Sequence, residues 1–251
     1  MIPLKPEITV RPVRETDAPA LRAVLNANLL TAPYSAPFTQ EMVETQLLAE
    51  NPPTVYPVRW QRNRCLGAWR AGQLIGFVDI ATGQDSESEQ LADFEPIGLM
   101  RFLALPDDPA LINEAAEKLL RAADQSWRSA GIGHVKAFHI STGYPSFQAG
   151  AGLLPGELAE QFRLLTGAGY RLATRHYALQ RKLTDLMEEE APMADLSLVH
   201  RGETGDWRYE IYRRRAERIA SARMVHAALD TIAPPVRVAY VTHIHVCLLY
   251  T

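Results

Sequence analysis

A long amphipathic helix flanked by two apolar strands favours a fold in which a sheet carries helical crossovers. Asp108 can cap the first turn of this helix, and Gly131 can end it. The stretches at 96–105 and 132–140 are apolar and short enough to be strands. A helix between two strands of one sheet acts as a crossover. The apolar face of the helix is formed by Ile112, Ala115, Ala116, Leu119, Leu120, Ala123 and Trp127.

The first part of the chain predicts antiparallel pairing. Alternating apolar and polar residues favour a first strand at 8–13. Capping residues and helical spacing then favour two helices, at 16–29 and 39–48. The segments 65–70 and 73–82 have the pattern of two strands, with an Ala-Gly pair as the tight turn between them.

The chain is then expected to return to the sheet. A loop with many glycines at 143–156 precedes a short helix over 158–165, and 170–183 is expected to form a long strand. Antiparallel pairing early and helical crossovers late predict an α/β fold, with a mixed sheet and helices on both of its faces.

Composition says more about the environment than about the activity. A formal net charge of −3 gives no reason to expect nucleic acid or an anionic membrane as a partner. No stretch approaches about 18 uninterrupted apolar residues, so no membrane span is expected. Residues 1–6 lack a signal-peptide pattern. Cys65 and Cys247 are not in metal-ligand spacing, and reduced thiols in a cytoplasmic protein without a metal site are expected.

A weak internal similarity predicts a second, shorter unit. The segment 214–219 compares with 70–75, and each is expected at the centre of a hairpin. The apolar strand that opens at Pro235 likewise compares with the one that opens at Pro96. The order and spacing of these segments, more than their residues, support the repeat.

The expected organisation follows from this similarity. We expect one complete unit at 1–184, an exposed linker at 185–194 with three consecutive glutamates, and a partial second unit at 195–251. The partial unit ends after its fourth strand, where the first unit continues into its long helix. We therefore expect the sequence to be truncated, and whether 247–251 are native is left open.

The ordered motifs resemble the GNAT superfamily of acyl-CoA-dependent N-acetyltransferases. The resemblance covers residues 8–183, and more faintly 195–246. It is carried by Ile8–Pro12 with Thr16–Leu21, by the hairpin Gly67–Ile80, by Leu99–Leu105 with the helix that follows to Ser129, and by Gly167–Arg171.

The resemblance implies transfer of an acetyl group from acetyl-CoA to an amine of a small molecule or peptide. In this family a splayed strand offers its backbone to the pantetheine arm, and amides at the start of the next helix hold the pyrophosphate. Carried over to this chain, the implied cofactor-binding residues are Leu103, Ala104, Leu105, Ile112 and Asn113, with Ile244, His245 and Val246 in the second unit.

The chain departs from the family pattern at two places. The expected phosphate loop, 111–116, contains neither glycine nor arginine, and Glu114 would oppose a pyrophosphate. Leu165 falls where the family often has a catalytic tyrosine. No catalytic residue is therefore assigned. The alternative to an acetyltransferase is a catalytically silent GNAT-like module that supports a tandem partner.

Five further side chains have two interpretations each. His139 can act as a base, although a hydrogen-bonded structural histidine is favoured. Tyr144 and Phe147 can line an acceptor pocket or anchor their loop. His243 and His245 share a strand face but have no third ligand in view, so contact with an acyl-CoA is favoured over a metal.

Overall fold

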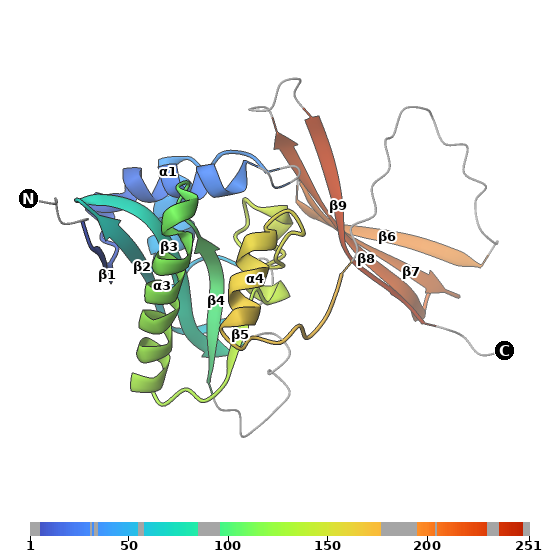
Figure 1. Ribbon diagram of the computed structural model, residues 1–251. Helices are drawn as coiled ribbons and strands as arrows, with labels where there is room; N and C mark the ends of the chain where they lie inside the picture. The colour runs from blue at the N-terminus through green and yellow to red at the C-terminus, as the bar shows by residue number, and fades with distance from the viewer. Residues whose placement is uncertain are drawn as a thin grey trace, which may run out of the picture. The chain divides into compact units, whose positions relative to one another are not determined.

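The computed structural model describes residues 6–30, 32, 35–54, 58–84, 96–176, 195–203, 205–229 and 236–247 (Figure 1). The chain divides into two compact units. The first comprises 1–170 with 229–236, and the second comprises 171–228 with 237–251. The predicted linker 185–194 lies outside the described residues.

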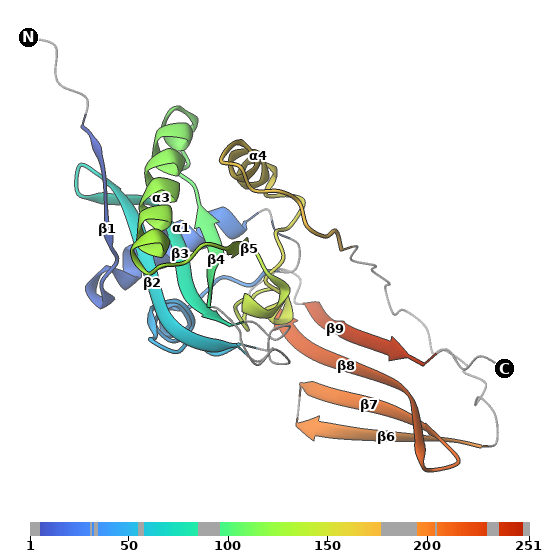
Figure 2. The same cartoon turned by 90° about the horizontal axis from the view of Figure 1, so that it is seen from below.

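The first unit is built on one mixed sheet. Its strands follow the chain order β1-β2-β3-β4-β5, with antiparallel pairing from β1 to β4 and parallel pairing of β4 with β5 (Figures 1 and 2). This confirms the predicted mixed-sheet α/β class. The strands are β1 (Ile8–Pro12), β2 (Arg59–Arg70), β3 (Gln73–Gln84), β4 (Ile97–Ala104) and β5 (Val135–Ala137).

Helices cover both faces of this sheet. The long helix α3 packs against β1, β2 and β3, whereas α1 packs against β3 and β4 on the other side (Figure 2). The side chain of Asp108 caps α3 by accepting from the Ala110 amide, as expected. The helical segments are α1 (Ala18–Leu29), α2 (Gln40–Val43) with its continuation η2 (Glu44–Leu48), α3 (Pro109–Ser129) and α4 (Ala159–Gly167).

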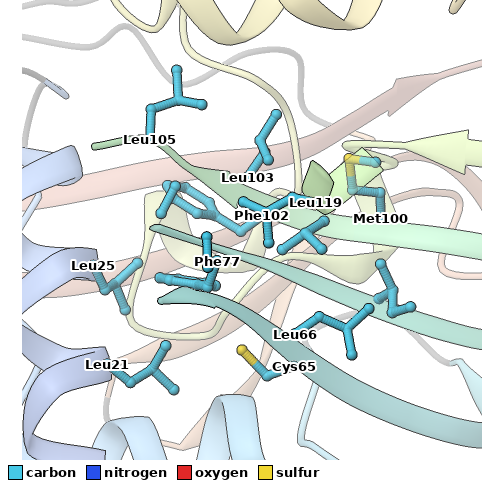
Figure 3. Close-up of a cluster of buried hydrophobic side chains, with 14 of the residues drawn as sticks. Leu21, Leu25, Cys65, Leu66, Phe77, Met100, Phe102, Leu103, Leu105 and Leu119 are labelled. Carbon is cyan, nitrogen blue, oxygen red and sulfur yellow. The ribbon is translucent and has the colours of Figure 1, made fainter. Parts of the chain in front are cut away.

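The core lies where these layers meet. Phe77 of β3 and Phe102 of β4 are buried side by side, with ring centroids 6.0 Å apart. Leu21 and Leu25 of α1 approach them, and Leu119 of α3 belongs to the same cluster (Figure 3). Each such side chain stabilises the fold by about 1.5–3 kcal/mol relative to an exposed position.

Two predicted strands differ from the structure. The strand expected at 132–140 is only Val135–Ala137, because Phe138 adopts a positive φ of 54° that turns the chain away. Residues 170–176 of the strand expected at 170–183 are not a strand, and 177–183 lie outside the described residues. Within the described part of the chain, 170–176 have no neighbouring strand to pair with, and alternation alone does not form a ladder.

The second unit is a four-stranded sheet of order β6-β7-β8-β9. Its β7–β8 turn, where Arg214 and Arg215 have positive φ, lies at the predicted hairpin. The strand expected from Pro235 begins at Val236. The interpretation of this unit as part of a second GNAT-like domain stays a prediction. The strands are β6 (Leu196–Glu203), β7 (Asp206–Arg213), β8 (Glu217–Leu229) and β9 (Val236–Val246).

This second sheet has two unlike faces. On one face, Trp207 and Tyr209 lie on either side of His200 of the neighbouring strand, at ring-centroid distances of 5.5 and 6.4 Å. On the other face, Arg223 binds Asp206 at 2.9 Å. None of the described side chains in this unit is fully buried.

Candidate functional site

The pairing of β4 with β3 contains an irregularity in the first sheet. Ile80 pairs with Met100, but Asp79 pairs with Phe102, so Arg101 is an extra residue that forms a β-bulge. Bulges bend a strand and increase its twist. The bulge lies one residue beyond the last β4 residue that pairs with β5.

At this point β4 and β5 separate. Their parallel pairing covers only Gly98–Met100, and the last bond between the two segments joins the Phe138 amide to the Met100 carbonyl at 2.8 Å. Beyond Met100, no strand in the described ranges pairs with this side of β4. The separation is the splayed strand that the family resemblance implies.

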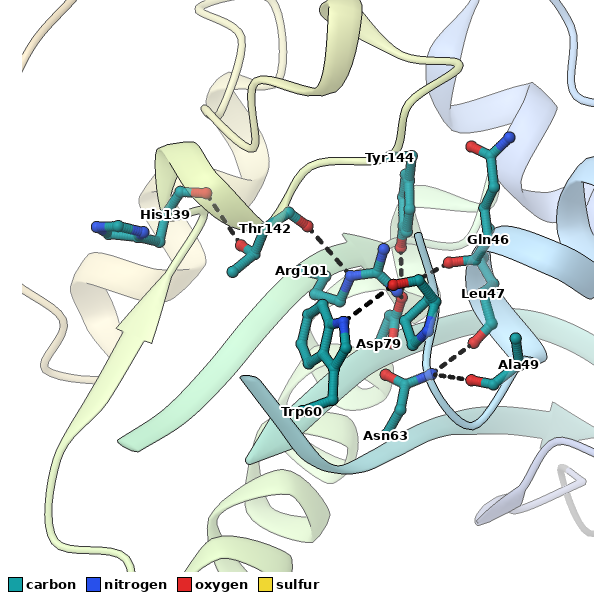
Figure 4. A network of polar contacts seen from close by, with 11 residues as sticks. Gln46, Leu47, Ala49, Trp60, Asn63, Asp79, Arg101, His139, Thr142 and Tyr144 are labelled. Carbon is teal, nitrogen blue, oxygen red and sulfur yellow. Dashed lines mark hydrogen bonds and ion pairs between the residues drawn. The ribbon is translucent and has the colours of Figure 1, made fainter. Parts of the chain in front are cut away.

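Arg101 ties three segments together beside the split (Figure 4). Its Nη1 donates to the Asp79 carboxylate at 3.2 Å and to the Gln46 carbonyl at 2.8 Å. Its Nε donates to the Thr142 carbonyl at 3.1 Å. The side chains of Arg101 and Asp79 are both 0% exposed. The bulged residue therefore links β3, η2 and the loop after β5.

Aromatic side chains complete this cluster. The Tyr144 hydroxyl donates to Asp79 at 2.7 Å, and the Arg101 guanidinium lies 4.5 Å from the centre of the Tyr144 ring. Trp60 lies on the guanidinium as well, at 5.2 Å. Cation–π contacts of this kind add to the ion pair because the site is dry.

Burial dominates the electrostatics here. It raises the pKa of Asp79 to about 6, against the lowering effects of Arg101 and of the hydrogen bond from Tyr144. Burial also raises the pKa of Tyr144 and of the nearby Cys65 thiol, so both stay protonated at neutral pH. Within the ranges that the structure describes, the Asp79 Oδ1 and Arg101 Nη2 atoms are buried and have no hydrogen-bond partner. Since solvent does not reach these groups, they can position the split but cannot contact a substrate.

The start of α3 is poorly suited to an anion. The Ala110 amide already donates to the Asp108 carboxylate at 3.0 Å, and the Leu111 amide donates to the Asp108 carbonyl at 3.0 Å. Amides that would hold a phosphate are thus satisfied. The segment 111–116, where the phosphate loop is expected, forms the first turns of the helix.

Five of the predicted cofactor-binding residues lie in the first unit, on two separate elements. Leu103 and Ala104 are buried at the end of β4, and Leu105 follows them. Ile112 is half-buried in α3, and the exposed Asn113 accepts from Arg163 of α4 at 2.8 Å. Their contact with a cofactor stays a prediction.

The backbone of Leu105 has no free hydrogen-bonding group for a cofactor, although the resemblance implies that it binds one. Its amide donates to the Asn28 side chain at 2.8 Å, and its carbonyl accepts from the same side chain at 3.0 Å. With both backbone groups occupied, pairing with a ligand in the split falls to the residues between Met100 and Leu105.

The three predicted residues of the second unit lie on β9. Ile244 and Val246 are 68% and 59% exposed, and His245 is exposed as well. The side chain of His243 lies outside the described part. Among the residues that the structure describes, no three His, Cys, Asp or Glu side chains gather as they would around a metal ion.

The side chains of the loop after β5 hold the loop in place. His139 Nδ1 lies 2.7 Å from the Ser141 hydroxyl. Tyr144 and Phe147 are 2% and 4% exposed, which favours the interpretation that they anchor the loop. Tyr144 also has a role that the sequence did not indicate, as a donor to Asp79.

A cavity of about 250 Å³ lies on the other side of the β4 end, between α1, the start of β3 and the start of α3. It is lined by Val24, Asn28, Gln73, Leu74, Ile75, Leu105, Pro106, Asp107, Asp108 and Leu111.

The cluster around Arg101 was not predicted from the sequence. The available signal was a charged residue inside each of two strands that are otherwise apolar, Arg101 in 97–104 and Asp79 in 73–82. A charge is rarely buried unless it is paired, so two such residues in neighbouring strands favour a buried ion pair.

Comparison with known proteins gives a likeness of fold only. No protein-family model and no curated protein matches the chain. Similar solved structures include an aminoglycoside N-acetyltransferase in complex with CoA, at 11% identity and a TM-score of 0.47, covering 73% of this chain and 100% of that one. Ribosomal-protein-alanine N-acetyltransferase from Brucella melitensis biovar Abortus 2308 is 12% identical with a TM-score of 0.47, covering 69% and 99%.

A third similar structure belongs to a protein described differently. A transcriptional regulator from Bacillus halodurans C-125 is 8% identical with a TM-score of 0.49, covering 70% of this chain and 100% of that one. At these identities and scores the likeness decides neither activity nor substrate.

No helix in the described part of the chain is long and apolar enough to cross a membrane.

Proposed function

We propose that the first unit is a GNAT-type acyltransferase that binds an acyl thioester in the split between β4 and β5. The observation that carries this proposal is the bulge at Arg101 followed by the loss of β5 pairing after Met100. An extended pantetheine arm carries two amides. It can therefore pair with a strand edge much as an added strand does.

The proposed reaction moves acetyl from acetyl-CoA to an amine of a small molecule or peptide. The amine nitrogen attacks the thioester carbonyl, the carbon–sulfur bond breaks, and the thiolate leaves as the amine gives up a proton. We assign no side chain to the proton transfer. A cytoplasmic setting and the absence of a nucleic-acid partner belong to the same proposal.

The start of α3 sets a condition on this binding. Because its first amides are satisfied by Asp108, the diphosphate of CoA gains little there. The pantetheine arm then carries most of the affinity. Acetyl-pantetheine, which lacks the diphosphate, should bind within about tenfold of acetyl-CoA.

Calorimetric titration of the full chain with both thioesters tests the proposal. Binding of acetyl-CoA in the micromolar range, on the order of −8 kcal/mol, supports it. Hydrogen exchange should then slow at 101–104 and around Phe138, but not in α1, when acetyl-CoA is added. Absence of binding at millimolar ligand, or protection only at the α3 start, overturns it.

A catalytically silent module is the second candidate. It is favoured by the occupied and acidic start of α3, where the carboxylates of Asp107 and Asp108 would repel an anion. Detection of free thiol during incubation with acetyl-CoA and a panel of amines separates the two. Binding with no acceptor-dependent thiol release supports the module, and release that requires an amine supports the enzyme.

A further inference from the structure

The cavity beside the end of β4 is lined by both apolar and polar residues, and the exposed carboxylates of Asp107 and Asp108 form its rim. Its apolar walls are contributed by three elements, with Val24 from α1, Leu74 from β3 and Leu111 from α3 among them. Asn28 forms a fixed part of the wall, because both ends of its amide are bonded to the Leu105 backbone. A hollow that combines apolar side chains with a few oriented polar groups is typical of a small-molecule site.

The charge of the rim determines which sign of charge a ligand can carry. None of the described side chains that line the cavity is basic, and two of them are the carboxylates of Asp107 and Asp108. The start of α3 contributes only about half a positive charge, which the two carboxylates outweigh. The cavity therefore repels anions.

Asp107 is the group that remains available. The Asp108 carboxylate is engaged with the Ala110 amide at 3.0 Å. Asp107 is exposed, and among the described residues its carboxylate has no hydrogen-bond or ion-pair partner. A cation at the rim would meet a carboxylate that gives up no existing bond.

We propose that this cavity binds a small organic cation, a primary amine or guanidine on a short apolar chain. The cationic head lies at Asp107, and the chain lies against Val24, Leu74 and Leu111. At about 30 Å³ for a group the size of water, about 250 Å³ holds roughly eight such groups. A chain of about six carbons with one cationic nitrogen fits this space.

The site is separate from the proposed thioester site. The cavity lies on the side of β4 that pairs with β3, and the split lies on the side that faces β5. Leu105 is shared, but only through a backbone that Asn28 already occupies. The proposal therefore stands without the acyltransferase activity.

Three probes of equal length test the sign of the charge. n-Hexylamine is protonated at neutral pH, 1-hexanol is neutral and hexanoate is an anion. Binding to the full chain is followed by shifts of backbone amide resonances at Leu74 and Leu111. We expect n-hexylamine to bind more tightly than 1-hexanol and hexanoate to bind most weakly. Equal or tighter binding of hexanoate overturns the proposal.

Variants then locate the site. Asp107→Asn should weaken n-hexylamine about two- to fivefold, as expected for an exposed ion pair, and leave 1-hexanol unchanged. Glu117→Gln, the same charge change elsewhere on α3, should leave both probes unchanged. Val24→Phe fills the cavity without altering charge and should abolish binding of both. Unchanged n-hexylamine binding in either Asp107→Asn or Val24→Phe overturns the proposal.

Discussion

Replacing Arg101 with methionine tests the central claim about the β4 bulge. The change removes the bonds to Gln46 and Thr142 and leaves the Asp79 carboxylate in a dry site with Tyr144 as its remaining partner. Removing one partner of a buried ion pair costs about 3–5 kcal/mol. We expect the free energy of unfolding of the first unit to fall by that amount at pH 8.

A second variant identifies the source of this cost. In the Asp79→Leu/Arg101→Met double variant no charge is left unpaired, and only the carbonyls of Gln46 and Thr142 and the hydroxyl of Tyr144 lose partners. We expect the double variant to be more stable than the single variant, because no buried charge is left unpaired, although each unmade hydrogen bond still costs about 1–3 kcal/mol. The cost of the single variant should also shrink at pH 5, where Asp79 is mostly protonated in the parent chain.

Urea unfolding followed by tryptophan fluorescence measures these differences. A Trp207→Phe background confines the signal to the first unit, which holds Trp60 and two further tryptophans. Arg121→Met is the matched control, because its side chain is 73% exposed and should change stability by less than about 0.5 kcal/mol. A cost below about 1 kcal/mol for Arg101→Met would refute the reasoning, as would a double variant less stable than the single one.

Three further results are expected. Since the folded pKa of Asp79 is about 6 and its ordinary value is 3.8, the stability from this group is present below about pH 4 and lost as pH rises through 6, by about 3 kcal/mol. Asp79→Asn should remove that part of the slope between pH 4.5 and 7.5, and an unchanged slope contradicts the raised pKa. Gly152→Ala should lower stability by about 1–3 kcal/mol in thermal unfolding, because a Cβ there meets the His139 carbonyl, while Gly156→Ala, in open space, should have almost no effect. Asp108→Ala should cost about 1 kcal/mol through the lost cap of α3, and a helix that is equally stable without it would show that the cap is not needed.

Local signals were sufficient for most of the first unit. The cap at Asp108, the Ala71-Gly72 turn and the spacing of apolar residues depend on neighbours within a few positions, so the helix and hairpin could be predicted. The strand at 170–183 depended on a partner that local pattern does not reveal. Likewise, β5 is short because the chain turns at Phe138, and no residue preference predicts a positive φ at a phenylalanine.

The candidate site divides in the same way. The splayed strand was expected at the end of β4 because motif order carried the family resemblance. The ion pair between Arg101 and Asp79 was not predicted, because only the register of the sheet brings these two residues together. The occupied backbone of Leu105 also depends on Asn28, a residue 77 positions away, so no short motif could have indicated it.

The bulge also bears on which insertions and deletions the gene can tolerate. Ahead of Arg101, Gly98 faces Trp127 of α3, whereas beyond it Phe102 faces Phe77 and Tyr144. The extra residue shifts the alternation by one place, so deleting any single residue between Met100 and Ala104 would turn every following side chain of β4 to the opposite layer. The number of residues in this strand is therefore fixed. We expect insertions and deletions among related genes to lie outside β4.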